Sequence, residues 1–488
     1  MPNRGANRRS ADSGAATSLR QQVYERLRAA IEQGTLAPGA RLPPSREQAQ
    51  LLNVGRNTVL WAVDRLRAEG YLVARVGDGT YVAGDIAALR PAGRRRVAPV
   101  VLAGSLSQRG QLIAETALRW RPPTAPAVPF RIGTPAIDEF PFAVWERLER
   151  QTTPAVRRAT SHYQDPAGHL PLREAVAHWL LLSRGIRCEA AQVIVTAGSQ
   201  QAIDLIGRLL LDPGDEVLVE DPGYPGIRAC LVGHGALARP VPVDDEGLTI
   251  AAAAARWPAA RMAVVTPTHQ FPLGVRMSLA RRLALLDWAR AQKAWIVEDD
   301  YDGEFQYGAH RIPALCSLPH AERVLYVGTF SKTLHPGLRL GFIVLPAALA
   351  GAFASAKALA DRHGPAALQD VLARFITDGH LFRHLRRMRE LYPARQATTI
   401  EALARASGGA LRLAPSAQGL HLCHELTAPR GTDSAFAARA GEAGVFLAPL
   451  SAYAVESRRQ GLLFGFAGYD TAALNAAARR VGALFRQR

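Results

Sequence analysis

The chain of 488 residues is 48% hydrophobic, which is enough for at least two domains with cores of their own. Its 59 basic and 42 acidic residues give a formal net charge of +17, which favours a polyanionic partner such as nucleic acid. No apolar stretch of about eighteen residues is free of charge, so a membrane-spanning helix is excluded. The four cysteines are scattered without metal-site spacing, so we expect a protein of the reducing cytoplasm that binds no metal.

The N-terminal region begins with a polar segment, residues 1–17, that we expect to be disordered and that lacks the apolar core of a signal peptide. Apolar residues from Leu19 to Gln33 then recur at the spacing of an amphipathic helix, which Gly34 ends. Ser45 is expected to cap a short second helix, and a turn leads from there into a further helix that ends near Glu69. Two helices joined by a glycine-containing turn predict a helix-turn-helix.

A β-hairpin is predicted directly after these helices. The segment Tyr71–Val82 alternates apolar residues on both sides of Gly-Asp-Gly, so it would form a wing. Residues 1–98 contain sixteen arginines, no lysine and eight acidic residues, a balance that suits a polyanion. In a winged helix the second helix of the motif meets base edges in the major groove, while the wing reaches the backbone or minor groove. The residues expected to contact double-stranded DNA are therefore Arg46, Arg56, Asn57, Thr58, Gly77, Gly79 and Thr80.

Residues 18–84 are thus expected to form a DNA-binding domain, and residues 85–129 a linker. The linker contains a basic triplet at 94–96 and ends in a proline-rich run at 122–129 that cannot continue a helix. Only the part around Leu106 to Arg119 is expected to be helical. The second domain then occupies residues 130–488.

Within the second domain, the segment Val193–Ile203 has the pattern of an apolar strand, a turn of small residues and a helix. Such a turn directs free backbone amides at an anion from the helix N-terminus. Gly198, Ser199 and Gln200 are therefore candidates for a phosphate cradle, with Arg339 supplying positive charge. Many strand-to-helix turns start with small residues, so this pattern alone is weak.

A second apolar strand, Ala294–Val297, leads to Asp299 and Tyr301 at its C-terminal end, where open α/β sheets bind ligands. A third, Val324–Val327, is followed by Lys332, one of only three lysines in a chain that otherwise uses arginine. Unlike arginine, a lysine can lose its charge and form a Schiff base with an aldehyde. The hydroxyls of Thr329 and Ser331 lie beside it in the sequence.

These segments resemble the pyridoxal phosphate (PLP) site of fold-type I aminotransferases. The resemblance implies that Lys332 forms the Schiff base with PLP, that Asp299 keeps the ring nitrogen protonated and that Tyr301 contacts the ring oxygen. Asp221–Pro225 resembles the family loop whose aromatic residue stacks on the ring, here Tyr224. Thr266–Gly274 matches the family's Asn-Pro-Thr-Gly region only in outline, so His269 or Gln270 stands in for the ring-contacting asparagine.

The first domain resembles the GntR family, with the elements Pro-x-Ser-Arg-Glu, Arg-Asn-Thr-Val and Gly-x-Gly-Thr-Tyr-Val. A GntR-type winged helix followed by an aminotransferase-like domain is the layout of the MocR subfamily of bacterial transcription regulators. The implied fold is α/β: a winged helix-turn-helix, a mixed, mostly parallel sheet with helices on both faces, and a small C-terminal α+β part. The resemblance also implies a head-to-tail homodimer, in which Tyr163 reaches the phosphate of the neighbouring subunit's cofactor.

One feature departs from the aminotransferase pattern. Those enzymes commonly carry an arginine in a strand of the form x-Arg-x-x-Phe-Ala, where it grips the substrate carboxylate. Here Leu463 occupies that place, and Arg458 or Arg459 are the neighbouring candidates for compensation. The loss fits a sensor of PLP itself, or of an unusual amine, better than a general transaminase.

Three hypotheses follow for the function. The first is a DNA-binding regulator that senses PLP or an amino compound through an aldimine at Lys332. The second is a working aminotransferase with a DNA-binding domain, against which the leucine at 463 argues. The third is a repressor that uses the second domain only as a dimer scaffold, against which Lys332, Asp299, Tyr301 and Arg339 argue.

Overall fold

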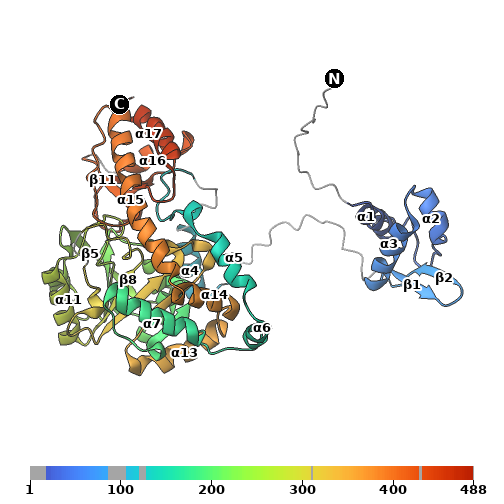
Figure 1. Cartoon of the computed structure of the whole chain (residues 1–488), viewed down its shortest axis with the longest axis horizontal. Helices are drawn as coiled ribbons and strands as arrows, with labels where there is room; N and C mark the ends of the chain where they lie inside the picture. Colours follow the sequence, from blue (N-terminus) through green and yellow to red (C-terminus); the bar gives the residue numbers. More distant parts are fainter. Residues whose placement is uncertain (1–17, 86–105, 120–127, 309–311, 428–430, 487–488) are drawn as a thin grey trace, which may run out of the picture. The chain divides into compact units, whose positions relative to one another are not determined.

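The computed structural model describes residues 18–85, 106–119, 128–308, 312–427 and 431–486. Two compact units divide the chain, residues 1–105 and 106–488 (Figure 1). The predicted disordered tail and most of the predicted linker lie outside the described residues. Among the described residues, no helix is long and apolar enough to cross a membrane.

The first unit is a winged helix-turn-helix, as predicted. Its three helices and two strands follow in the order α1 (Leu19–Glu32), α2 (Ser45–Leu51), α3 (Arg56–Ala68), β1 (Leu72–Arg75) and β2 (Gly79–Val82). The strands pair antiparallel, with Leu72 opposite Val82 and Arg75 opposite Gly79. One prediction is corrected: Ser45 is the first residue of α2 and does not cap it, because Pro44 holds the cap position and Ser45 Oγ accepts from Arg56 Nε at 3.2 Å.

This unit has a core of its own, formed where α1, α3 and the hairpin meet. Val23, Ile31, Leu66 and Leu72 are buried in it. Two phenols close its edges, because Tyr24 donates a hydrogen bond to Glu69 at 2.5 Å and Tyr71 donates one to Glu32 at 2.8 Å. The cluster is compact enough to fix the recognition helix against the wing.

Helix α4 (Gln108–Arg119) forms within the predicted linker, and it belongs to the second unit. Its Arg109 donates from Nε to the carbonyl of Gly233 at 2.7 Å, and its Nη2 lies 3.2 Å from Nδ1 of His234. Ile113 packs against the same glycine, where an added Cβ would lie 3.3 Å from its side chain. The predicted linker therefore contains a helix that docks on the second unit.

The second unit is built on an eight-stranded mixed sheet of order β3-β10-β9-β8-β7-β4-β5-β6. Strands β4, β5, β7, β8 and β9 run parallel to their neighbours among themselves, whereas β10 is antiparallel to both β3 and β9. The predicted mixed, mostly parallel sheet is thereby confirmed. The strand bounds are β3 (Val193–Thr196), β4 (Glu216–Asp221), β5 (Leu237–Asp244), β6 (Gly247–Leu248), β7 (Met262–Val265), β8 (Trp295–Asp300), β9 (Val324–Thr329) and β10 (Gly341–Val344).

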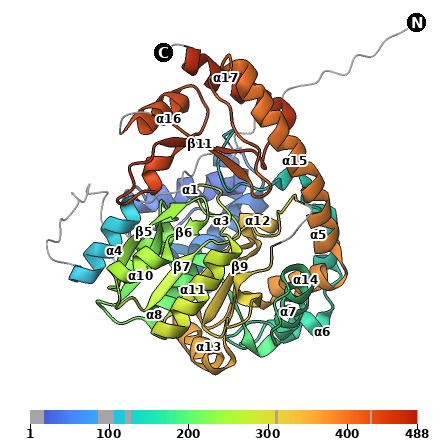
Figure 2. The ribbon, with the colours of Figure 1, turned by 90° about the vertical axis from the view of Figure 1, so that its left-hand side faces the viewer.

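Helices cover both faces of this sheet (Figure 2). Alternate strand residues such as Val219 and Val264 pack in one cluster with residues of α8, α9 and α13, whereas Leu218 and Val265 pack on the opposite face with α10 and α11. This two-sided burial explains why the strands read as continuous apolar runs. The helices are α8 (Ser199–Leu210), α9 (Pro225–Gly233), α10 (Ile250–Arg256), α11 (Leu279–Gln292) and α13 (Ala347–Asp361).

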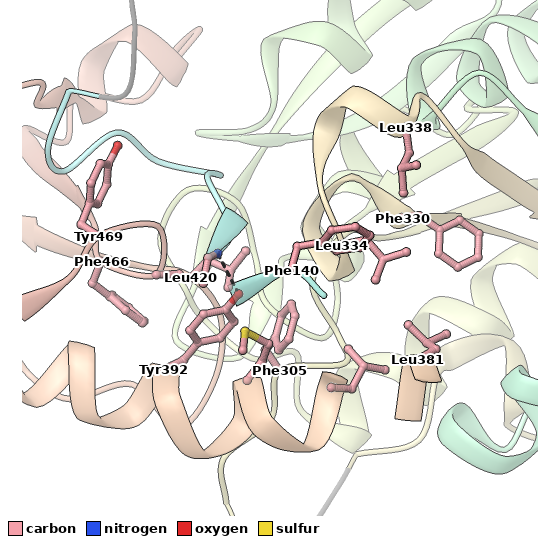
Figure 3. Packing of buried hydrophobic residues seen from close by; sticks show 14 of the residues in the cluster. Phe140, Phe305, Phe330, Leu334, Leu338, Leu381, Tyr392, Leu420, Phe466 and Tyr469 are labelled. Atoms are coloured by element: carbon pink, nitrogen blue, oxygen red, sulfur yellow. Dashed lines mark hydrogen bonds between the residues drawn. The ribbon is translucent and has the colours of Figure 1, made fainter. Parts of the chain in front are cut away.

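The C-terminal part contains a small antiparallel sheet of order β11-β13-β12 beside a long helix, α15 (His380–Ala406). Figure 3 shows Tyr392 of α15 beside Phe305, and the two ring centres lie 4.9 Å apart. The Tyr392 hydroxyl accepts from the backbone nitrogen of Ala136 at 3.2 Å, which ties the beginning of the domain to this helix. The other elements are α5 (Phe142–Arg150), α6 (Pro154–Thr160), α7 (Leu170–Arg184), α12 (Phe330–Thr333), α14 (Ala366–Thr377), β11 (His421–Glu425), α16 (Thr432–Glu442), β12 (Ala448–Pro449), β13 (Gly461–Gly465) and α17 (Thr471–Arg486).

Candidate functional site

The predicted ligand residues follow strands that end at one edge of the large sheet. Because β3, β4, β7, β8 and β9 share a direction, their C-terminal ends open on the same side. Gly198, Tyr224, His269, Tyr301 and Lys332 each lie within about five residues of such an end, so the segments after five strands carry them to the same edge of the sheet. Asp299 is the penultimate residue of β8 itself.

Lys332 lies in the short helix α12, directly after β9. Its Nζ donates to the carbonyl of Gly133 at 2.8 Å, across 199 residues of sequence. Gly133 has a φ of 71°, and a Cβ added there would lie 2.7 Å from that Nζ, so the site requires glycine at this position. Burial lowers the pKa of the Lys332 amine, although the charges of Asp302 and Asp299 oppose the shift. The fraction of neutral, nucleophilic amine is therefore larger than in a free lysine.

Among the acidic residues at the end of β8, Asp299 is the one available to a ligand. Its neighbours point to the other face of the strand: Glu298 accepts the backbone amides of Leu315 and Cys316, and Asp300 pairs with Arg184 at 2.7 Å. Asp299 is buried, and its Oδ1 has no hydrogen-bond partner among the described residues. Burial, followed by the charges of nearby acidic residues, raises the pKa of Asp299 to about 7. A cationic ring nitrogen beside this buried group would stabilise its ionised form.

Tyr301 belongs to a buried hydrogen-bonded group with His269 and Asp302. The Tyr301 hydroxyl lies 2.9 Å from Nδ1 of His269, and Asp302 Oδ2 lies 2.8 Å from the same nitrogen. Burial and the neighbouring carboxylates raise the pKa of Tyr301 well above its usual range, so it remains a donor. The carboxylate fixes the orientation of the imidazole, which in turn positions the phenol.

The loop 266–274 places its two candidates differently. His269 lies against Tyr301, whereas Gln270 bonds to its own loop and to the loop after β4. The Gln270 side-chain nitrogen donates to Pro222 O at 2.9 Å and to Phe271 O at 2.6 Å, and its oxygen accepts from the Leu273 amide at 3.1 Å. The structure thus brings His269 to the phenol and keeps Gln270 in a loop-stabilising position.

The turn between β3 and α8 lies beside Arg339. Gly198 has a φ of 91° and occupies the N-cap of α8 without a side chain, and a Cβ there would lie 3.3 Å from Arg339 Nη2. Arg339 donates to the carbonyl of Ala197 at 2.7 Å, so its charge is held at the amides of Ser199 and Gln200. The Gln200 side chain points elsewhere, because its nitrogen donates to Gly226 O at 3.0 Å.

The two hydroxyl residues before Lys332 differ in their hydrogen bonding. Thr329 caps helix α12, because its Oγ1 accepts from the Ser331 amide at 3.1 Å. The Ser331 side chain is partly exposed and has no hydrogen-bond partner among the described residues. Thr329 thus shapes the turn that carries the lysine, and Ser331 has a free hydroxyl beside it.

Two aromatic candidates lie in contrasting environments. Tyr224 is the N-cap residue of α9 and packs edge-on against Phe271, with ring centres 5.7 Å apart. Its pKa is raised by burial and by the charge of Asp299, while the charge of Arg339 lowers it. Tyr163 is 85% exposed, and its ring contacts His363 and the Arg362 guanidinium. No contact joins Tyr163 to the site of its own chain within the described ranges.

The two arginines proposed to compensate for Leu463 lie in different surroundings. Arg459 forms a bidentate ion pair with Glu425, at 2.5 and 2.7 Å, and donates to Val243 O. Arg458 is exposed. Leu463 itself is fully buried within β13, and of the two arginines Arg459 is already engaged by Glu425.

In the first unit, the residues predicted to contact DNA are all exposed or partly exposed. Arg46, Arg56 and Asn57 are exposed at the first turns of α2 and α3, and Thr58 is partly exposed. The wing tip at Gly77 and Gly79 is exposed too, and Thr80 is partly exposed. Arg56 rests on Ser45, which presets the direction of its guanidinium.

Sequence reasoning missed several residues that the fold adds to these sites. Gly133 and His421 come from distant segments and show no local motif, whereas Asp302 continues the acidic run after Tyr301 and was open to recognition. In the winged helix, Arg41 lies beneath the wing, where a Cβ on Gly79 would lie 3.1 Å from its Nε.

Comparison with protein families identifies both units. Residues 19–82 match the model of the gntR family of bacterial regulatory proteins, and residues 130–481 match aminotransferase class I and II. A probable rhizopine catabolism regulatory protein, MocR of Rhizobium meliloti, is 39% identical over 94% of this chain and 92% of its own. The HTH-type pyridoxine biosynthesis transcriptional regulator PdxR of Corynebacterium glutamicum is 31% identical, over 93% of each chain.

Solved structures resemble the second unit. Kynurenine aminotransferase of Pyrococcus horikoshii, in complex with PMP, has a TM-score of 0.68 at 27% identity and covers 79% of this chain and 96% of its own. The α-aminoadipate aminotransferase LysN of Thermus thermophilus, complexed with N-(5'-phosphopyridoxyl)-L-leucine, has the same TM-score at 28% identity and covers 76% and 97%. The aminotransferase fold is therefore present nearly entire.

Proposed function

Because the chain belongs to the MocR subfamily of GntR-family transcription regulators, we propose that it is a DNA-binding regulator that holds PLP and senses PLP or an amino compound. The observation that carries this proposal is the amine of Lys332 beside the unpartnered carboxyl of Asp299, in one chain with a winged helix. Its place of action would be the cytoplasm, where DNA is found. All four cysteines are free thiols.

The residues at the sheet edge fit PLP. The unpartnered Oδ1 of Asp299 would hold the ring nitrogen, and Tyr301, oriented by His269, would hold the ring oxygen. Tyr224 would cover a ring face. The backbone amides after Gly198, with the Arg339 guanidinium and the Ser331 hydroxyl, would hold the phosphate, since a helix N-terminus and a cation both favour an anion.

The chain's own groups prepare this site for an amine. When bound, PLP supplies an aldehyde that a neutral amine attacks and a ring that acts as an electron sink. Burial keeps part of Lys332 neutral, as that attack requires, and the Gly133 carbonyl holds its nitrogen in place. Asp302 retains His269 in one orientation, so Tyr301 needs no reorganisation when a ligand arrives.

A regulator is favoured over an efficient aminotransferase by the buried Leu463. Transamination requires the substrate's Cα–H bond to be held perpendicular to the cofactor plane, and a carboxylate clamp supplies much of that positioning. Leucine has no hydrogen-bond donor to offer. A regulator needs only ligand-dependent populations of two conformations, which binding alone provides.

The site assignment is tested by loading purified protein with PLP, reducing it with borohydride and mapping the modified lysine by mass spectrometry. We expect the label on Lys332 and visible absorbance before reduction. Lys332→Ala should lose both, whereas Lys293→Arg, at an exposed helix end, should retain them. A label on another lysine in the wild type would refute the assignment.

A further inference from the structure

One face of the small sheet carries a buried histidine, His421. Residues paired across antiparallel strands share a face, and His421 pairs with Gly465 while Cys423 pairs with Leu463. His421, Cys423 and Leu463 therefore line one face. The intervening Leu422 and Phe464 pack into the hydrophobic core on the other.

His421 connects this face with the candidate cofactor site. Its ring centre lies 5.0 Å from that of His269 and 5.7 Å from that of Phe271. Burial and the neighbouring charges of His269 and Lys332 lower the pKa of His421 to about 3, so the ring is neutral at physiological pH.

The hydrogen bonding of His421 determines what its free nitrogen can recognise. Nε2 lies 3.0 Å from the carbonyl of Pro272, which only accepts, so Nε2 carries the proton. Nδ1 of a neutral ring is then an acceptor, and no partner for it occurs among the described residues. Such a nitrogen binds a hydroxyl or N–H group and is repelled by a carboxylate.

The acidic residues of the neighbouring cofactor site also disfavour a carboxylate. Glu220, Asp299 and Asp302 are buried acidic residues whose charges act on Tyr301. The guanidinium of Arg339 is held at the phosphate cradle by its hydrogen bond to the carbonyl of Ala197. A ligand carboxylate beside Leu463 would therefore lack the guanidinium that an arginine at this position would supply.

We propose that the amino compound sensed here is a primary amine that carries a hydroxyl group and no α-carboxylate, with His421 accepting from the hydroxyl and Leu463 excluding the carboxylate. This inference rests on the proposed function, since it presumes an amine-binding site at Lys332. Leu463 and His421 are then specificity-determining residues of that site.

The test compares matched ligands on PLP-loaded protein by calorimetry and by the change in visible absorbance. The pairs are ethanolamine with L-serine, L-alaninol with L-alanine and tyramine with L-tyrosine, and ethylamine is the amine without a hydroxyl. We expect at least one amino alcohol or hydroxylated amine to bind about tenfold or more tightly than its amino acid, and ethanolamine to exceed ethylamine. Equal or tighter binding of every amino acid, or no binding of any amine to loaded protein, overturns the inference.

Two substitutions locate the specificity. His421→Phe should keep PLP loading and lose about tenfold or more in affinity for the hydroxylated amines, with ethylamine unchanged. Leu463→Arg should improve binding of the amino acids, with Leu463→Met as the matched control that keeps the wild-type ranking. If the arginine variant fails to fold, His421→Phe and the wild-type ranking decide. Failure of PLP to load at Lys332 refutes the proposed function instead, so the two failures are distinguishable.

Discussion

Burial and neighbouring carboxylates raise the pKa of Asp299 in the cofactor-free protein. Its folded pKa of about 7 lies above the ordinary value of 3.8, so the folded chain binds this proton more tightly than the unfolded chain. The associated stability is present at low pH and is lost as pH rises towards 7. The ionised carboxylate of Asp299 destabilises the cofactor-free protein, and a cationic ligand bound beside it would offset this destabilisation.

We predict that Asp299→Asn flattens the pH dependence of unfolding. Between pH 5 and 8, the cofactor-free wild type should lose about 2–3 kcal/mol more than the variant, because each pKa unit corresponds to about 1.4 kcal/mol. Urea unfolding without PLP measures this difference. Asp287→Asn, at an exposed ion pair, should behave like the wild type, and equal slopes for all three proteins would contradict the account.

At the recognition helix, Arg56 is expected to read a base and Arg46 to contact phosphate. Arg56→Ala should weaken operator binding by about 1–3 kcal/mol and relax specificity at one position, whereas Arg46→Ala should weaken binding evenly across sequences. Competition gel shifts at fixed salt measure both. Arg67→Ala, at the other end of α3, is the control; losses equal to that control for both variants would remove the winged helix from DNA recognition.

Among the structural elements, α4 is held to the second unit through few contacts, of which those of Arg109 are the main polar ones. Arg109→Ala should release this helix, because it removes a charged donor from the carbonyl of Gly233, worth about 1 kcal/mol at a partly exposed position. Amide hydrogen exchange over 108–119 should accelerate roughly fivefold. Gln111→Ala, on the exposed side of the same helix, should leave exchange unchanged; the same rate in both variants would contradict this docking.

The sequence predicted most elements because each has a local signal. Apolar strands followed by small residues, the Gly-Asp-Gly hairpin and the helical spacing after Leu19 were confirmed. The cap role of Ser45 was wrong, because Pro44 already fixes the backbone there, and serine instead accepts from Arg56. Gly133 and His421 bond to residues more than a hundred positions away in the sequence, and no local pattern encodes such contacts.

At the scale of the whole molecule, the proposed head-to-tail homodimer would complete each site with Tyr163 of the neighbouring subunit. Its 85% exposure in one chain fits a side chain that a partner covers. We predict complementation: Tyr163→Phe should weaken PLP binding, and Lys332→Ala should abolish its covalent capture. In mixed dimers of the two variants, one site carries both defects and the other none.

Titration of PLP into such mixtures should therefore show wild-type affinity at up to one site per hybrid dimer. Each variant measured alone is the control, and a hybrid with no restored site would contradict the head-to-tail arrangement.

The central claim is that occupancy at Lys332 is communicated to DNA binding. The most direct measurement is operator affinity at fixed salt, with and without PLP, for the wild type and Lys332→Ala. We predict that PLP changes wild-type affinity by about 5- to 150-fold, the usual range of coupling between sites, and leaves the variant unchanged. Wild-type affinity indifferent to PLP, or an equal change in Lys332→Ala, would contradict the account.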